Sequence, residues 1–160
     1  MITAILRKMG SKTPGWVVAR LISIWPPYLG AGIKVMEIAP DYRYIKVCLK
    51  QAWYNRNYVG TQFGGSLYAM TDPFFMLMFI NNLGHDYYVW DKGATIDFVS
   101  PGKTKVTVEF RIDDAIINKV LQETASGEKY IFDLPVEVLD ADGALVATVL
   151  KKLYVRKKKK

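Results

Sequence analysis

The chain has 160 residues, of which 51% are hydrophobic and 13% aromatic, and its formal net charge is +7. Such a chain is large enough for one domain with a sizeable core and too apolar to be intrinsically disordered. Residues 151–160 hold seven positive charges and no acid, so the remainder of the chain is neutral. The excess charge therefore belongs to a tail and not to the basic face that nucleic-acid-binding proteins present.

Four features of the sequence bear on location and cofactors. Cys48 is the only cysteine, which excludes an internal disulfide and favours a reducing compartment. Arg7 and Lys8 are not followed by an uninterrupted apolar core, so we expect no export signal and a cytoplasmic location. No apolar run reaches the roughly 18 residues that suggest a membrane span. His85 is the only histidine, and no ligand spacing predicts a metal site.

The first third of the chain predicts one helix and an extended segment. Apolar residues at helical spacing predict a helix from Pro14 to Trp25, which ends at the prolines 26 and 27. A glycine-rich turn at residues 30–32 follows, and residues 33–50 alternate as a strand does. Residues 53–58 then form an aromatic, asparagine-rich loop.

The centre of the chain predicts a buried helix. The segment from Ser66 to Leu83 is apolar on nearly every side, and a helix that is apolar all round is buried all round. Pro73 lies within this segment, where a proline deletes one backbone hydrogen bond and kinks the helix.

The remainder predicts strands and one short helix. Residues 94–98 and 106–112 alternate between apolar and polar side chains, as half-buried antiparallel strands do. Asp113 is a suitable cap for a short helix over residues 115–123. Residues 132–138 alternate in the same way and predict a further strand.

The last strand differs from the others. A hairpin turn at residues 140–143 leads into residues 144–155, which are apolar on both faces and therefore predict a central strand. A buried helix followed by about four antiparallel strands is an α+β arrangement in which the sheet wraps around one long central helix, the hotdog fold. We expect an N-terminal helix and turn in residues 1–32, the hotdog domain in residues 33–155 and a basic tail in residues 156–160.

The most informative motif is Asn57-x5-Phe63-Gly64-Gly65-x6-Asp72. A helix start presents unpaired N–H groups, and glycine lets a ligand approach them closely. A carboxylate within an apolar segment is costly unless it has a partner or a chemical role. Hydrolysis of an activated acyl group requires both an anion-stabilising group and an acid or base of this kind.

This motif resembles the active-site segment of hotdog-fold acyl-CoA thioesterases of the phenylacetate-degradation type, which show Asn, then His-Gly-Gly, then Asp at the same offsets. A longer pattern over residues 30–156 is similar to a hotdog subfamily that is grouped with thioesterases and has no established substrate. Its additional elements in this sequence are Gly60-Thr61, Asp72-Pro73, Trp90-Asp91-Lys92, Pro101-Gly102 and Asp142-Gly143.

The resemblance implies a role for each motif residue. Gly65, together with Gly64, would supply an oxyanion N–H, Asp72 would act as general base or nucleophile, and Asn57 would orient the water or the thioester. The reaction would convert an acyl-CoA, or a thioester of an acyl carrier, to a carboxylate and a thiol. No cofactor is expected apart from the coenzyme A of the substrate.

Four further residues are expected to contact the substrate. Phe63 and Tyr68 belong to an aromatic cluster that would wall an acyl pocket, with ordinary core packing as the alternative. Thr61 belongs to the subfamily pattern, and Lys92 is a candidate contact for the phosphates of coenzyme A.

Other interpretations remain open. Asp72 could merely cap a second helical segment, the two glycines could form only a tight turn, and Asn57 could satisfy its own loop through an Asx turn. Phe63 stands where the resembling enzymes have histidine, which favours an alternative function: a hotdog domain that binds acyl-CoA or lipid without turning it over. A third interpretation, an adaptor that binds membranes or nucleic acid, depends on the lysine tail alone, and we expect neither nucleic acid nor integral membrane contact.

The spacing of the motif predicts the assembly. Gly65 and Asp72 lie roughly 10 Å apart along one helix, whereas both must come within about 3 Å of the same reacting atoms. Two antiparallel helices related by a two-fold axis can meet this requirement. We therefore expect a homodimer, with a tetramer as the larger alternative, and two composite sites in each dimer.

Overall fold

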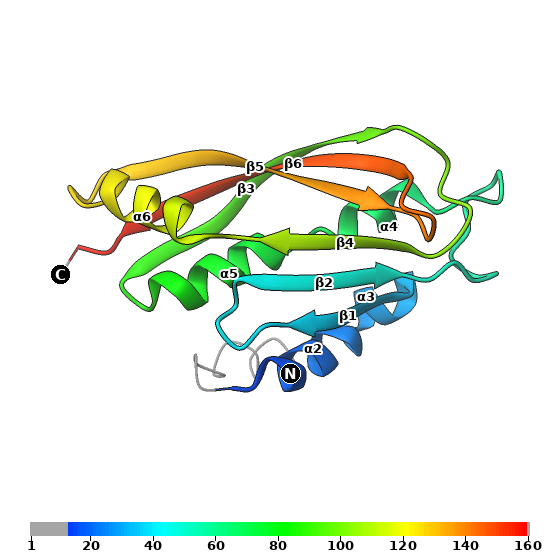
Figure 1. Ribbon diagram of the computed structural model, residues 1–160, viewed down its shortest axis with the longest axis horizontal. Coiled ribbons are helices and arrows are strands. Elements are labelled where there is room, and N and C mark those ends of the chain that lie inside the picture. Colours follow the sequence, from blue (N-terminus) through cyan, green and yellow to red (C-terminus); the bar gives the residue numbers. More distant parts are fainter. Residues whose placement is uncertain (1–12, 160) are drawn as a thin grey trace.

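The computed structural model describes residues 13–159, in which six antiparallel strands form one sheet in the order β1-β2-β4-β5-β6-β3 (Figure 1). The elements in chain order are α2 (Gly15–Ser23), α3 (Pro26–Ala31), β1 (Ile33–Ile38), β2 (Tyr44–Leu49), α4 (Gly64–Ala69), α5 (Phe74–Leu83), β3 (Tyr87–Phe98), β4 (Val106–Arg111), α6 (Asp114–Glu123), β5 (Lys129–Leu139) and β6 (Leu145–Lys157).

Strand β6 lies inside the sheet, as its apolar sequence predicted. It pairs along its length with β5 on one side and with the edge strand β3 on the other. Inward-facing residues of β6 alternate with outward-facing ones, so that a single strand contributes to both faces of the sheet. The pairing of β3 with β6 is interrupted by a bulge between Asp91 and Gly93.

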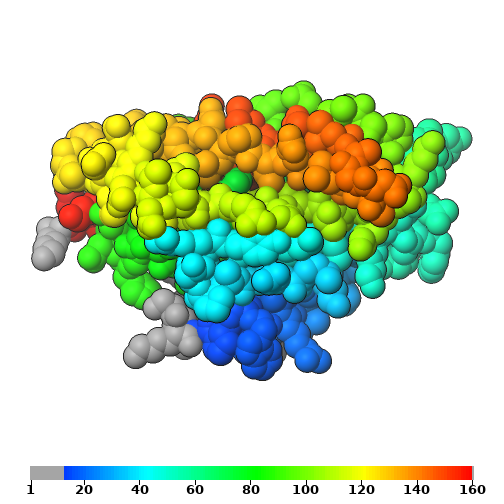
Figure 2. All heavy atoms as spheres, in the orientation of Figure 1, coloured from blue at the N-terminus to red at the C-terminus, as the bar shows by residue number. Residues whose placement is uncertain are grey.

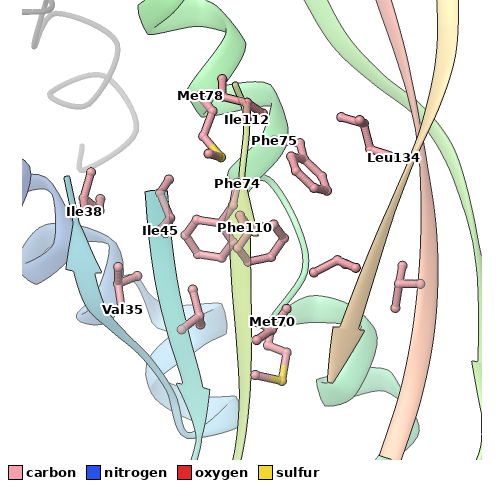
Figure 3. Close-up of a cluster of buried hydrophobic side chains, with 14 of the residues drawn as sticks. Val35, Ile38, Ile45, Met70, Phe74, Phe75, Met78, Phe110, Ile112 and Leu134 are labelled. Carbon is pink, nitrogen blue, oxygen red and sulfur yellow. The ribbon is translucent and has the colours of Figure 1, made fainter. Parts of the chain in front are cut away.

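The hydrophobic core lies between the sheet and helix α5. Phe74 and Phe75 of α5 each place their ring 5.1 Å from that of Phe110 on β4, and Phe79 lies 5.4 Å from Phe132 on β5. Figure 3 shows Phe74, Phe75 and Phe110 meeting aliphatic side chains from β1 and β2 in a single cluster. The sheet therefore wraps around a central helical segment, and the predicted α+β hotdog fold is confirmed.

The central helix consists of two segments. α4 ends at Ala69 and α5 begins at Phe74, and between them lies a cis peptide bond that joins Asp72 to Pro73. Because Pro73 has no N–H and its ring crowds the preceding turn, a continuous helix cannot pass this position. The sequence predicted a kink at Pro73, and the structure shows a complete break between two helices at this position.

Residues 13–32 contain one more helix than the sequence predicted. Helix α2 ends at Ser23, and α3 begins at Pro26 instead of the chain merely turning there. Proline suits the first positions of a helix because the N–H it lacks would have no partner there. Gly32, with φ of 79°, ends α3 and leads into β1, against which α2 packs (Figure 1).

From β4 onward the elements follow the prediction closely, apart from the charged end, whereas β3 begins at Tyr87 and not near residue 94. The Asp113 carboxylate caps α6 by accepting a hydrogen bond of 2.8 Å from the N–H of Ile116. Strand β6 continues to Lys157, so the boundary predicted at residue 156 lies within the strand. Figure 2 shows the outer face of the sheet covered by side chains of β2, β4 and β5. No helix among residues 13–159 has the length and apolarity needed to cross a membrane.

Candidate functional site

The break between α4 and α5 exposes Asp72 on a well-anchored loop. Thr71, immediately before it, is fully buried, and the hydroxyl of the buried Tyr28 donates a hydrogen bond to the backbone carbonyl of Asp72. The Asp72 side chain itself is 48% exposed. Pro73 occupies the N-cap position of α5, and no side-chain cap bond is formed there. The carboxylate of Asp72 is therefore not used as a helix cap and can accept other partners.

The partner of Asp72 is Lys151, whose charge the sequence analysis had counted with that of the basic tail. Lys151 lies on β6 in phase with the buried residues Val149 and Leu153, and its side chain is completely buried. Its Nζ lies 3.3 Å from Oδ1 of Asp72 and 3.5 Å from Oδ2 of Asp91. The expectation that all charge of residues 151–160 belongs to a tail is thus wrong for Lys151. Its ammonium is buried inside the protein and is paired with two acids, as a buried charge must be.

Asp91 completes a cluster of two carboxyl groups and one ammonium. It lies on β3 beside the bulge, and both of its oxygens are buried without a hydrogen-bond partner in the described part of the chain. Burial, and next the nearby Asp72, raise the pKa of Asp91 to about 7, although Lys151 acts in the opposite direction. Burial and the two carboxylates also raise the pKa of Tyr28.

The roles of Asp91 and Lys151 were missed by the sequence analysis, although a signal for both existed. Asp91 is in phase with the buried Val89 on β3, and Lys151 is in phase with Val149 on β6. A charged residue at an inward-facing position of a strand needs a partner of opposite charge. The Trp90-Asp91-Lys92 element of the subfamily pattern contained the first of these residues, but the pattern assigned it no role.

The glycine pair forms the first turn of α4, at the opposite end of that short helix from Asp72. The N–H groups of Gly64 and Gly65 donate no hydrogen bond within residues 13–159. A Cβ atom on Gly64 would lie 2.9 Å from the ring of Phe98, and one on Gly65 would lie 2.5 Å from the ring of Phe63. A side chain at either position would therefore have to displace an aromatic ring that packs directly against the backbone.

Asn57 organises the loop that precedes α4. Its Oδ1 accepts hydrogen bonds from the N–H groups of Val59 and Thr61, at 3.1 and 2.9 Å. Its Nδ2 donates to Oγ1 of Thr61 at 2.8 Å and to the carbonyl of Gln62 at 3.3 Å. Because both ends of the amide are used within the loop, Asn57 has the structural Asx role that we left open as an alternative.

A surface groove of about 370 Å³ runs beside the start of α4. Its walls are the loop that carries Asn57 and Thr61, the first residues of α4 including Gly64, and the end of β3 at Phe98 with the residues that follow. The groove thus combines three predicted site residues with an aromatic side chain that is 58% exposed.

The predicted site residues fall into two groups within one chain. Asp72 and Tyr68 lie beside Lys151, whose Nζ is 5.3 Å from the centre of the Tyr68 ring. The remaining motif residues gather at the start of α4 and in the loop before it: Asn57, Thr61, Phe63, Gly64 and Gly65. Lys92 is exposed within the bulge of β3 and belongs to neither group.

The two groups supply complementary chemistry. The first offers a half-exposed carboxylate held by a buried cation, next to an acid that titrates near neutral pH, which suits proton transfer. The second offers free backbone N–H groups beside a groove, which suit the binding of a carbonyl oxygen or an anion. Six residues of α4 separate the groups by about 9 Å along the helix axis. No group of three or more potential metal ligands occurs among the described residues.

Known structures share this architecture. A Pseudomonas aeruginosa protein of unknown function, described as a probable thioesterase, is 20% identical with a TM-score of 0.79, over 91% of this chain and 97% of that one. A thioesterase from Haemophilus influenzae is 11% identical with a TM-score of 0.65, over 91% and 92% of the two chains. The PaaI protein of the E. coli phenylacetic acid degradation operon is 14% identical with a TM-score of 0.59, over 90% and 93%.

At these identities the likeness establishes the fold, and that fold is the hotdog fold of the thioesterases that the motif resembled. No curated protein matches the sequence. The profile of the family described as "Domain of unknown function (DUF4442)" matches residues 15–155, and the chain therefore belongs to this family.

Proposed function

We propose that this protein hydrolyses an acyl thioester, of coenzyme A or of an acyl carrier, to a carboxylate and a free thiol. Asp72 takes a proton from water as the water oxygen attacks the thioester carbonyl. Alternatively, the Asp72 carboxylate attacks that carbonyl itself, and water hydrolyses the resulting mixed anhydride after the thiolate has left. In either case the carbon–sulfur bond breaks, and the thiolate leaves and is protonated. The N–H groups of Gly64 and Gly65 bind the carbonyl oxygen while it carries negative charge.

The observation that carries the proposal is the environment of Asp72. Its side chain is 48% exposed although its partner Lys151 is completely buried. An acid whose only role was to neutralise a buried lysine would be expected inside the protein with it. Asp72 instead combines a fixed position with access to solvent, and a general base or nucleophile needs both.

The edge strand β3 supports a composite site in a dimer. Its outer edge has no partner among residues 13–159, and it carries the exposed aromatic residues Tyr88, Trp90 and Phe98. A long unpaired edge of this kind is a template for pairing with a second copy. Asp91 lies beside Asp72 toward one end of β3, and Phe98 packs on Gly64 at the other.

This arrangement of β3 suggests how two copies would meet. If two β3 strands pair antiparallel about a two-fold axis between Asp91 and Phe98, the Asp72 end of one protomer faces the glycine end of its partner. A carboxylate and an oxyanion-binding turn that are separate in one chain are then brought to one thioester. The similar structures described as thioesterases agree with this reaction class.

The direct test is release of free thiol from a panel of short, medium, long and aromatic acyl-CoAs. Asp72→Asn should lower kcat/KM by roughly 10²–10⁴-fold, the usual contribution of a positioned acid or base. Asp133→Asn is the matched control, because Asp133 pairs with the exposed Lys152 at 3.9 Å on the other face of the sheet. Equal turnover by the wild type and Asp72→Asn would refute the assignment of Asp72.

One observation favours a second function, acyl-CoA or lipid binding without turnover. The ring of Phe63 packs on Gly65 and replaces the histidine of the resembling enzymes. Tight binding of an acyl-CoA with no thiol release by the wild type would support this function. Under the thioesterase proposal, Phe63→Leu, which keeps an apolar side chain but removes the ring, retains turnover.

A further inference from the structure

The cluster of Asp72, Asp91 and Lys151 contains one positive charge and two acids. Lys151 is completely buried and the Asp91 side chain is 19% exposed. With both carboxyl groups ionised, the cluster would hold a net negative charge around a buried lysine, and only its Asp72 side has ready access to solvent. With one carboxyl protonated, the charges balance, and this is the state that burial favours.

The proton belongs on Asp91 and not on Asp72. Asp72 is the more exposed acid, with 48% of its side chain accessible, and its Oδ1 accepts the hydrogen bond of 3.3 Å from Nζ of Lys151. Asp91 is the more buried acid, and neither of its oxygens has a hydrogen-bond partner in the described part of the chain. A buried carboxyl that accepts no hydrogen bond is better neutral than ionised.

We propose that Lys151 and Asp91 are positioning residues for Asp72: near neutral pH Asp91 carries the proton of the cluster, so that the Lys151 ammonium pairs with the Asp72 carboxylate and directs it at the substrate. This inference rests on the proposed function, because it assigns the support of the same carboxylate. Neither residue touches the thioester. Both act through the orientation and charge of Asp72.

The proposal makes the cluster sensitive to pH in a defined direction. The titratable groups that face Asp91 are Asp72 from the loop after α4, Lys151 from β6 and Tyr28 from α3. Tyr28 stays neutral because burial raises its pKa. When Asp91 loses its proton, its carboxylate competes for the ammonium of Lys151, Asp72 loses its exclusive partner, and turnover falls on the alkaline side.

The experiment combines two measurements on the full chain. Carbon NMR of the aspartate carboxyl groups, titrated from about pH 4 to about pH 9, reports which acid holds the proton. Thiol release over the same range gives the pH dependence of kcat for the wild type, Asp91→Asn and the control Asp133→Asn. Asn in place of Asp91 is neutral at every pH, as the protonated acid is, so this variant keeps the charge balance that the proposal requires.

Two results together would support the proposal: titration of Asp91 near neutral pH, and an alkaline fall in kcat that is lost in Asp91→Asn and kept in Asp133→Asn. Titration of Asp91 as an ordinary surface carboxyl would overturn it, whether or not thioesters are hydrolysed. An alkaline fall in kcat that persists in Asp91→Asn would also overturn it. If Asp91 titrates near neutral pH but the wild type releases no thiol from any acyl-CoA, the proposed function is refuted, and the positioning role with it.

Discussion

Two triads of charged residues on opposite faces of the sheet show how burial reverses the behaviour of similar groups. On the outer face, Glu109 of β4 accepts hydrogen bonds from Lys46 and Arg111, at 2.9 and 2.8 Å, and all three side chains are partly exposed. On the inner face, Asp72 and Asp91 share the completely buried Lys151. The outer triad has two cations and one acid, and the inner triad has one cation and two acids.

The pKa shifts of the two triads are opposite. Hydrogen bonds from Lys46 and Arg111 lower the pKa of Glu109 to about 2, whereas burial and the neighbouring Asp72 raise the pKa of Asp91 to about 7. The outer triad therefore has no acid that exchanges a proton near neutral pH, and the inner triad has one. This difference is what makes the inner face the candidate site for acid–base chemistry.

Replacing the buried lysine should have the largest effect. Lys151→Met leaves two acids without their cation and should reduce the free energy of unfolding by on the order of 3 kcal/mol at alkaline pH. The loss should be smaller at acid pH, where Asp91 is neutral. Chemical denaturation at both pH values measures this difference.

The matched control is Lys152→Met, one residue along β6 on the outer face. Lys152 is 49% exposed and pairs with Asp133 at 3.9 Å, so its replacement should change stability by less than about 0.5 kcal/mol. Similar losses for the two variants would contradict the view that burial distinguishes the two faces.

An intermediate effect is expected for the hydroxyl that anchors the Asp72 loop. Tyr28→Phe removes the donor to the carbonyl of Asp72 and should cost about 1–2 kcal/mol, because a partly buried carbonyl loses its partner. Turnover should fall as well, since the loop that carries Asp72 loosens. Tyr42→Phe is the control: Tyr42 is also buried, but its hydroxyl makes a long hydrogen bond of 3.4 Å to Thr13. A larger loss for Tyr42→Phe would contradict this role of Tyr28.

The pH dependences of stability should have opposite signs for the two triads. The pKa of Asp91 is raised from 3.8 by folding, so its contribution to stability is complete below about pH 4 and is lost as the pH rises through about 7. The pKa of Glu109 is lowered from 4.5, so its contribution is present above about pH 4.5 and is lost as the pH falls through about 2.

Unfolding free energies measured across the pH range test both contributions. Asp91→Asn should remove the decline in stability between acid and neutral pH, and Glu109→Gln should weaken the decline at strongly acid pH. An unchanged slope between acid and neutral pH in Asp91→Asn would show that Asp91 does not carry the shifted proton.

Sequence patterns were sufficient for the fold and for one half of the candidate site. Strand alternation predicted β4, β5 and β6, but it took β1 and β2 as one extended segment and found only the second half of β3. The apolar segment from Ser66 to Leu83 predicted the helix at the centre of the sheet. These predictions succeed because each depends on local periodicity. The extra helix α3 was missed because a proline pair was taken as the end of one helix and not as the start of another.

The inner triad could not be predicted because its residues meet only through the tertiary fold. Asp72 and Lys151 are 79 positions apart, and nothing in a single sequence pairs them. The other positive charges of residues 152–160 also hid the role of Lys151, because a run of basic residues predicts a solvated tail. Only its phase with Val149 and Leu153 distinguished it from Lys152. Asn57 differs from Lys151, since the hydrogen bonds of its side chain organise the loop before α4. The catalytic role that the motif suggested for Asn57 stays a prediction.

The central claim is that Asp72 acts with the glycine turn of a second protomer, and subunit complementation tests it most directly. Asp72→Asn and Gly65→Val should each be inactive alone, provided that both homodimers are folded. In a mixed population, heterodimers should contain one intact composite site, which restores about a quarter of the wild-type sites at equal mixing. Recovery of thiol release on mixing is the predicted result. Two folded, inactive variants that stay inactive when mixed would contradict the composite site.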